Sequence, residues 1–155
     1  FLQNDEAHQR KIIGAIRAYQ PEIILCNAPE DRHPDHGRSS RLVAEAAFLS
    51  GLQKIQTDKN GKSQVAWRPK YVFQYIQDRF LQPDFVVDIT NVFEQKIEAI
   101  KEEPQTYIST PDFLDSVVYR HKWFGKMIGV KYAEGFISEK MIGINNFDAF
   151  IKENT

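Results

Sequence analysis

Short, nearly continuous apolar runs constrain the fold of this chain more than any other feature. They cover residues 22–26, 71–76 and 84–89. Runs without a polar alternation are typical of strands buried on both faces, as in a parallel sheet covered by helices. Segments with helical periodicity separate the runs, so the order of elements predicts the α/β class. With so few strands visible, we expect part of a larger sheet, with one face or edge of the first strand left bare.

Start and stop signals place the helices between these strands. The first helix follows Asn4 as its N-cap and ends before Pro21. The second is expected from residue 37 to about residue 52, and the third over residues 91–101. A Thr-Pro pair, which combines a cap with proline at the first helical position, predicts a further helix over residues 110–127.

The remaining connections are less regular. Residues 59–62 read Lys-Asn-Gly-Lys, which is a turn signal inside a polar stretch. Residues 132–136 are expected to be extended or looped. At the end of the third helix, Lys101 leads directly into Glu102 without a capping residue or a turn. We therefore expect residues to be absent at this junction, so that Lys101 and Glu102 are not peptide-bonded neighbours.

Charge and cysteine content limit the partners and the compartment. The chain has 20 basic and 21 acidic residues and a formal net charge of −1, so it has no basic field for nucleic acid. No apolar run approaches the ~18 residues that indicate a membrane span. A single cysteine, Cys26, predicts a reducing, cytoplasmic setting. The chain begins at Phe1 without an initiator methionine or a signal-peptide pattern, so we expect a portion of a longer protein.

The densest polar cluster covers residues 30–36 and contains two histidines. It follows the first predicted strand, at the edge where open α/β sheets bind ligands. His33 and His36, with Asp35 between them, offer one metal ligand and an acid/base pair. The spacing alone is also compatible with a solvated loop, because a catalytic zinc usually takes three protein ligands. We expect both rings to face one cleft, with Asp35 within hydrogen-bond reach of His33.

Residues 30–36 also resemble the second signature of the LmbE-like (PIG-L) family of zinc-dependent N-acetylglucosamine deacetylases. Residues 83–89 and 132–136 resemble the family's later strand and its C-terminal motif, so the resemblance spans most of the chain. It is greatest to the deacetylases of the bacillithiol pathway. The resemblance implies a Rossmann-like, mostly parallel sheet flanked by helices, with residues 1–155 as the C-terminal portion of a single deacetylase domain.

The resemblance also implies a role for individual residues. His36 would bind Zn²⁺ together with a His and an Asp of an Ala-His-Pro-Asp-Asp motif that this sequence does not contain, and that motif also supplies the general base. His33 would be the cationic group that stabilises the oxyanion or protonates the leaving amine, with Asp35 orienting it. Glu134 would lie in the substrate pocket. The chain as given is therefore expected to be inactive by itself and to lack a complete tetrahedral zinc site.

Several residues have two interpretations. Arg32 would bind a carboxylate or phosphate of the substrate, or form an ion pair with Glu30 or Asp31. Glu134 is either a substrate contact or a structural acceptor for backbone donors. The other helix histidines and the tryptophans are expected to be packed or solvated rather than ligands, with sugar stacking left open for Trp67: His8, His121, Trp67 and Trp123.

The expected function is zinc-dependent hydrolysis of the acetamide of an N-acetylglucosamine conjugate. The first candidate substrate is N-acetylglucosaminyl malate in bacillithiol biosynthesis, and another small-molecule glycoconjugate is the alternative. A third possibility, from a different class, is a non-catalytic assembly fragment. The expected partners exclude nucleic acid and membranes, and the resemblance suggests a homo-oligomer such as a hexamer.

Overall fold

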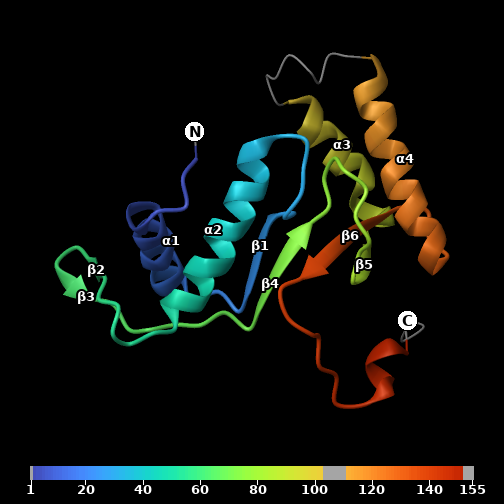
Figure 1. Ribbon diagram of the computed structural model, residues 1–155. Coiled ribbons are helices and arrows are strands. Elements are labelled where there is room, and N and C mark those ends of the chain that lie inside the picture. The colour runs from blue at the N-terminus through green and yellow to red at the C-terminus, as the bar shows by residue number, and fades with distance from the viewer. Residues whose placement is uncertain (1, 103–110, 152–155) are drawn as a thin grey trace.

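The computed structural model describes residues 2–102 and 111–151 and has helices around a central sheet (Figure 1). Its larger elements occur in the order predicted from the sequence. The elements are α1 (Glu6–Tyr19), β1 (Ile23–Asn27), α2 (Pro34–Ser50), β2 (Asp58–Lys59), β3 (Lys62–Ser63), β4 (Tyr71–Tyr75), β5 (Phe85–Asp88), the 3-10 turn η1 (Thr90–Val92), α3 (Phe93–Lys101), α4 (Pro111–Ile128), β6 (Ala133–Ser138) and the 3-10 turn η2 (Phe147–Phe150).

The sheet has four strands in the order β1-β4-β6-β5. Strands β1 and β4 pair in parallel, whereas β6 pairs antiparallel with both β4 and β5. Strands β1, β4 and β5 therefore run in the same direction, and β6 runs against them. The α/β class with flanking helices is confirmed. The sheet was expected to be mostly parallel. In the structure β6 lies between β4 and β5, so β1 and β4 are the one pair of parallel neighbours among the described strands.

The segment expected to be extended or looped forms most of β6, an inner strand of the sheet. Gly135 lies in the middle of it, and a Cβ added there would be 2.8 Å from Cζ of Phe124. Glycine therefore allows α4 to pack closely against the strand. The same glycine weakens the strand signal of the sequence, so this element was not recognised as a strand.

Two parts of the hydrophobic core lie on either side of the sheet centre. Helices α1 and α2 contact each other and cover the region of β1 and β4, where the buried cluster contains Ile16, Cys26, Ala47 and Val72. Helix α4 packs on β6, with a cluster of Ile76, Phe124 and Ala133. Strand β1 pairs only with β4 within the described residues, and its Ile23 and Leu25 are 52% and 60% exposed. The bare face expected for this strand is thus present.

Arg17 fixes the C-terminal end of α2. Its side chain is buried, and its guanidinium donates to the carbonyl oxygens of Ser50 at 3.0 Å, Leu52 at 2.8 Å and Ile55 at 2.6 Å. These carbonyls lie at and beyond the end of the helix, where intrahelical donors are missing. Arg17 belongs to α1, so the two helices are joined at the end of α2 that lies opposite His33 and His36.

The boundaries of three helices differ from the expected ones. Asp5, not Asn4, caps α1, because its carboxylate accepts the backbone N–H of His8 at 2.9 Å. Helix α2 begins at Pro34, three residues earlier than expected, with His33 as its N-cap. Helix α3 begins at Phe93, two residues later than expected, and ends at Lys101 with Glu102 as its C-cap, whose backbone N–H donates to Glu98 O at 3.2 Å. The expected absence of residues between Lys101 and Glu102 stays a prediction. Residue 110, the expected cap of α4, lies outside the described residues.

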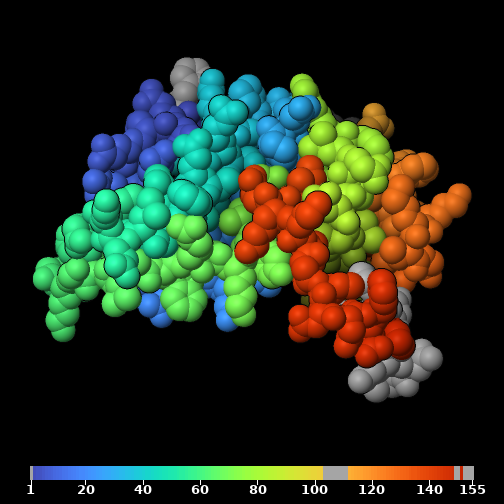
Figure 2. All heavy atoms as spheres, turned by 60° about the horizontal axis from the view of Figure 1, so that its bottom comes forward, coloured from blue at the N-terminus to red at the C-terminus, as the bar shows by residue number. Residues whose placement is uncertain are grey.

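Two segments project from the body of the molecule. The predicted turn joins β2 and β3 as a hairpin, and Asn60 and Gly61 have positive φ angles of 55° and 75°. Beyond β6 the chain leaves the sheet and extends away from α1 and α2 towards η2, drawn in red (Figure 2). Phe147 in η2 is 81% exposed.

Candidate active site

A cavity of about 760 Å³ opens at the edge of the sheet where β1 and β4 end. Asn27 and Tyr75, the last residues of these two strands, both line it. Because β6 runs in the opposite direction, the beginning of β6 lies at this same edge and brings Glu134 into the cavity. The location therefore agrees with the expectation that the ligand site lies at the carboxyl ends of the parallel strands.

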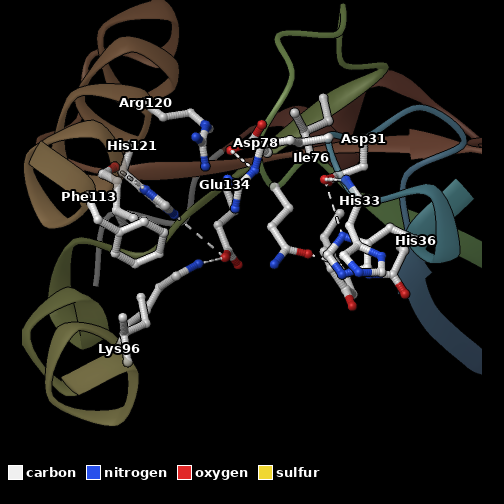
Figure 3. Close-up of a pocket in the computed structure, with 16 residues that line it drawn as sticks. Asp31, His33, His36, Ile76, Asp78, Lys96, Phe113, Arg120, His121 and Glu134 are labelled. Atoms are coloured by element: carbon white, nitrogen blue, oxygen red, sulfur yellow. Dashed lines mark hydrogen bonds and ion pairs between the residues drawn. The ribbon is translucent and has the colours of Figure 1, made fainter. Parts of the chain in front are cut away.

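The cavity has two walls (Figure 3). The first comes from the segment between β1 and α2 and from the first turn of α2, and it carries Asp31, Arg32, His33 and His36. The second comes from α3, α4 and β6 and carries Lys96, Arg120, His121 and Glu134. We call them the histidine wall and the glutamate wall.

His33 and His36 lie side by side in the histidine wall, with ring centroids 5.2 Å apart. Both line the cavity, so the expectation that they face one cleft is confirmed. The two positions are adjacent because His33 is the N-cap of α2 and His36 lies in its first turn. The N-terminal end of this helix therefore positions both rings.

Asp31 is the buried carboxylate beside these rings. Its side chain is 2% exposed, and Oδ1 lies 3.2 Å from Nδ1 of His36. Oδ1 also accepts the backbone N–H of His33 at 3.3 Å. The contact with His36 is close, but the ring N–H is not well directed for a hydrogen bond, and Oδ2 has no hydrogen-bond partner in the described part of the chain. With Nδ1 facing Asp31, Nε2 of His36 is the nitrogen left to bind a ligand.

Asp35 contacts His33 in a different way from the one expected. The backbone N–H of Asp35 donates to Nδ1 of His33 at 3.2 Å, whereas its carboxylate accepts a hydrogen bond from Arg38 at 2.8 Å. This hydrogen bond from Arg38 lowers the pKa of Asp35. The Asp35 carboxylate therefore does not orient His33. Because Nδ1 of His33 accepts a hydrogen bond, the neutral ring carries its hydrogen on Nε2, which makes Nε2–H a donor.

In the glutamate wall, Glu134 is contacted by two side chains from different helices. Lys96 of α3 forms an ion pair with Oε1 of Glu134, and Nε2 of His121 in α4 lies 3.7 Å from the same oxygen. Nδ1 of His121 donates to the carbonyl of Val117 at 2.6 Å. Glu134 thus lines the cavity, and its expected contact with the substrate stays a prediction. Its interpretation as an acceptor for backbone donors has no support among the described contacts.

His121 was not recognised as a site residue from the sequence. It is buried and lines the cavity, rather than being an incidental helix histidine. A signal was available, because His121 follows Val117 by four residues and precedes Phe124 by three, which places it on one face of the helix with these two apolar residues. A titratable side chain on such a face needs a polar partner, and Nδ1 of His121 finds one in the carbonyl of Val117 while Nε2 faces the cavity wall at Glu134.

Burial dominates the electrostatics of the glutamate wall. It lowers the pKa of Lys96 to about 8, and the neighbouring charge of Arg120 acts in the same direction. The contact with Glu134 opposes this change by favouring the ammonium form. Burial lowers the pKa of His121 to about 4, with further contributions from Lys96 and Arg120. His121 is therefore neutral near pH 7. Burial also lowers the pKa of Arg120, against the attraction of Asp78 and Asp31.

Arg32 lies at the mouth of the cavity. Its side chain is 67% exposed, and Nε lies 3.9 Å from Oδ1 of Asp78. Asp78 follows β4, so this ion pair joins the segments after β1 and β4, and it was not among the partners expected from the sequence, Glu30 and Asp31. Because Arg32 remains largely exposed, an anion in the solvent can reach its guanidinium.

No group of three or more metal-binding side chains (His, Cys, Asp or Glu) is arranged to hold a metal ion within residues 2–102 and 111–151. None of the helices in the described part is long and apolar enough to cross a membrane. Trp67, for which sugar stacking was left open, packs against the core under α1 and α2, and its indole N–H donates to Pro21 O at 2.8 Å.

Comparison with known proteins gives relatives of known activity. No protein-family model matches the chain. It is 26% identical over 136 residues to a diacetylchitobiose deacetylase of Thermococcus kodakarensis. This alignment covers 82% of this chain and 48% of that protein. The chain thus spans about half the length of this curated relative. A deacetylase of an N-acetylated sugar is therefore among its sequence relatives.

Solved structures share the fold. The conserved protein TT1542 from Thermus thermophilus aligns with a TM-score of 0.80 and 26% identity, covering 93% of this chain and 64% of that one. The N,N'-diacetylchitobiose deacetylase from Pyrococcus horikoshii aligns with a TM-score of 0.69 and 23% identity over 88% of this chain and 52% of that one. GalB, the 4-carboxy-2-hydroxymuconate hydratase from Pseudomonas putida, aligns with a TM-score of 0.72 and 20% identity, covering 92% of this chain and 62% of that one. The last two similarities concern the fold alone.

Proposed function

We propose that the cavity is one side of the active site of a zinc-dependent deacetylase that hydrolyses the acetamide of an N-acetylglucosamine conjugate. One observation carries this proposal: Nδ1 of His36 faces the buried carboxylate of Asp31, which leaves Nε2 for a metal at the cavity. Carboxylate–histidine–metal arrangements of this kind fix the ring and raise its basicity. The sequence similarity to a deacetylase supports the reaction.

The residues of the histidine wall fit a metal ion. Asp31 Oδ2 is buried without a hydrogen-bond partner in the described part, and a cation bound by His36 would offset that negative charge. His36 supplies one imidazole ligand, and the other ligands and the general base are proposed to come from a part of the whole protein outside this sequence. When bound, zinc would polarise the acetyl carbonyl and lower the pKa of its water.

His33 is proposed to act on the charge that develops during the reaction. Its Nε2–H is a donor on the side of the ring opposite the backbone contact with Asp35. A donor held in this way stabilises negative charge on the acyl oxygen as the carbonyl is attacked. Delivery of a proton to the leaving amine would require the imidazolium form of His33, in which Nδ1 also carries a hydrogen and no longer accepts the backbone N–H of Asp35.

The rest of the cavity is proposed to bind the remainder of the conjugate. A volume of about 760 Å³ lies in the range of small-molecule sites and exceeds what an acetamide group alone requires. The exposed guanidinium of Arg32 suits a carboxylate at the mouth, and this favours N-acetylglucosaminyl malate of the bacillithiol pathway as the first candidate substrate. The named activity of the Thermococcus relative favours an N-acetylated disaccharide as the second candidate. We also propose that the whole protein is cytoplasmic and forms a homo-oligomer.

The direct test uses the whole protein, purified with its native metal. We expect one zinc per subunit, and acetate release that a chelator abolishes and added zinc restores. N-acetylglucosaminyl malate and diacetylchitobiose are compared at equal concentration, with acetate measured enzymatically. A protein that binds zinc but releases acetate from neither sugar, nor from N-acetylglucosamine, would contradict the proposed reaction.

Asp31→Asn should weaken zinc binding by the whole protein about 10- to 100-fold, because it removes the carboxylate beside Nδ1 of His36. Asp35→Asn is the matched control. It keeps the backbone N–H that contacts His33 and changes only a carboxylate paired with Arg38. Zinc affinity is measured by competition with a chelator. Equal losses in both variants would show that Asp31 has no special relation to the metal.

A further inference from the structure

The glutamate wall contains a polar cluster that the proposed chemistry does not use. Lys96 from α3, His121 from α4 and Glu134 from β6 meet at the side of the cavity opposite His33 and His36 (Figure 3). Lys96 and Glu134 are both partly buried, with 31% and 28% of their side chains exposed, and the His121 side chain is 6% exposed. Burying these groups without partners would be costly, so their mutual contacts determine the geometry of this wall.

The hydrogen bonds of His121 determine which of its atoms faces Glu134. Nδ1 donates to the carbonyl of Val117 at 2.6 Å, so the neutral ring has a lone pair on Nε2. That nitrogen lies 3.7 Å from Oε1 of Glu134. Two acceptors at this distance repel each other unless a donor lies near both. The ammonium of Lys96 contacts Oε1 and has three N–H donors.

We propose that Lys96 and His121 are positioning residues that hold the carboxylate of Glu134 towards the cavity, where it accepts hydrogen bonds from the hydroxyl groups of the sugar. This inference rests on the proposed function and specifies which part of the substrate meets the glutamate wall. The charge of Lys96 is balanced by Glu134, so these two side chains form a neutral pair, whereas Arg120, the remaining charge of this wall, is attracted by Asp78 and Asp31. A neutral, hydroxyl-rich group suits the pair of Lys96 and Glu134, whereas an anionic group suits the exposed Arg32 at the mouth.

The charged groups around Lys96 make the arrangement sensitive to pH. Arg120 and His121 face it from α4 and Glu134 faces it from β6. When the ammonium loses its proton, the carboxylate loses its positively charged partner, and the neutral amine that remains is a weaker donor. Glu134 is then free to turn away, and the affinity for the sugar decreases without a change in the histidine wall.

The test compares variants of the whole zinc-loaded protein by steady-state kinetics on the best of the acetylated sugars. Glu134→Gln and Lys96→Met should each raise KM about 10- to 100-fold, the loss of a hydrogen bond to a charged group, with kcat within a few-fold of the parent. Lys96→Arg should recover most of the loss. The double variant should be no worse than the worse single variant, because both changes remove the same interaction. Lys101→Met, an exposed lysine of the same helix, is the control.

A pH profile separates positioning from general structural damage. The KM of the parent should rise above about pH 8, and Lys96→Arg should remove that rise, because arginine keeps its proton. His121→Gln should raise KM less than Lys96→Met does, since Glu134 keeps its ammonium partner. An unchanged KM in Lys96→Met, or a fall in kcat with unchanged KM, would overturn the inference.

One readout does not depend on turnover. In ¹⁵N NMR spectra of the whole protein, His121 should carry its hydrogen on Nδ1, and Lys96→Met should shift the Nε2 resonance while leaving His33 and His36 unchanged. Calorimetry with glucosamine then measures binding directly. If the parent and Lys96→Met bind glucosamine equally, the positioning role is excluded even where deacetylation is observed. If glucosamine binding depends on Lys96 but no acetate is released, the positioning role stands and the proposed reaction fails.

Discussion

In the whole protein, His36→Ala is expected to lose zinc and deacetylase activity together, whereas His33→Ala should keep its zinc and lose rate. The difference follows from the contacts of the two rings. Nδ1 of His36 faces a buried carboxylate, which leaves Nε2 for a metal, whereas Nδ1 of His33 accepts a backbone N–H and leaves Nε2–H as a donor. Donors that act on transition-state charge contribute roughly 10²- to 10⁴-fold to kcat and little to ground-state binding.

Two measurements on each variant decide the matter: zinc per subunit by mass spectrometry, and kcat and KM for acetate release. His8→Ala serves as the control, because His8 is on α1 and pairs with Asp5 outside the cavity. Loss of zinc from His33→Ala as complete as that from His36→Ala would make both histidines ligands. Full activity in both variants would place the active site elsewhere.

Acidification from pH 6.5 to pH 4 should cost the fold about 3 kcal/mol through His121 alone. Burial lowers its pKa in the folded state to about 4, whereas an unfolded histidine titrates near 6.5. In this window the unfolded chain binds the proton and the folded chain does not, so stability is complete above pH 6.5 and is lost as the pH falls. Each pKa unit corresponds to about 1.4 kcal/mol. The carboxylate of Glu134 opposes the lowering of the His121 pKa only weakly, because Lys96 already pairs with that carboxylate.

Urea unfolding of the metal-free protein at pH 7 and pH 4 measures this change for the parent and for His121→Gln. Carboxylates that titrate in the same range affect both proteins, so the difference between them isolates His121. The free energy of unfolding of the parent relative to the variant should fall by about 3 kcal/mol on acidification. Parallel pH dependences in the two proteins would show that His121 titrates normally in the folded state.

Local sequence signals predicted the elements that carry the histidine wall. The apolar run at residues 22–26 and the polar cluster after it placed His33 and His36 at the carboxyl end of a strand, and both line the cavity there. The choice of carboxylate was not predictable in the same way. Asp35 is nearer to the histidines in sequence, but the first turn of α2 directs it to Arg38, three residues on. Asp31 precedes the cap, and its carboxylate faces Nδ1 of His36.

The glutamate wall depends on contacts between distant segments, and the sequence alone did not reveal them. Lys96 and Glu134 are 38 residues apart and come from α3 and β6. They meet because β6 is inserted between β4 and β5, and this pairing was missed along with the strand itself. Periodicity identifies which face of α4 is packed, but it does not say that a cavity lies beside His121. Such a site requires the sheet order, which local patterns do not contain.

The division of the cavity into two walls has a consequence for how proteins with this fold diversify. The groups proposed to perform the chemistry lie in one short stretch after β1, and those proposed to select the sugar lie in α3, α4 and β6. Substitutions in the second set can change the preferred ligand while the first set stays intact.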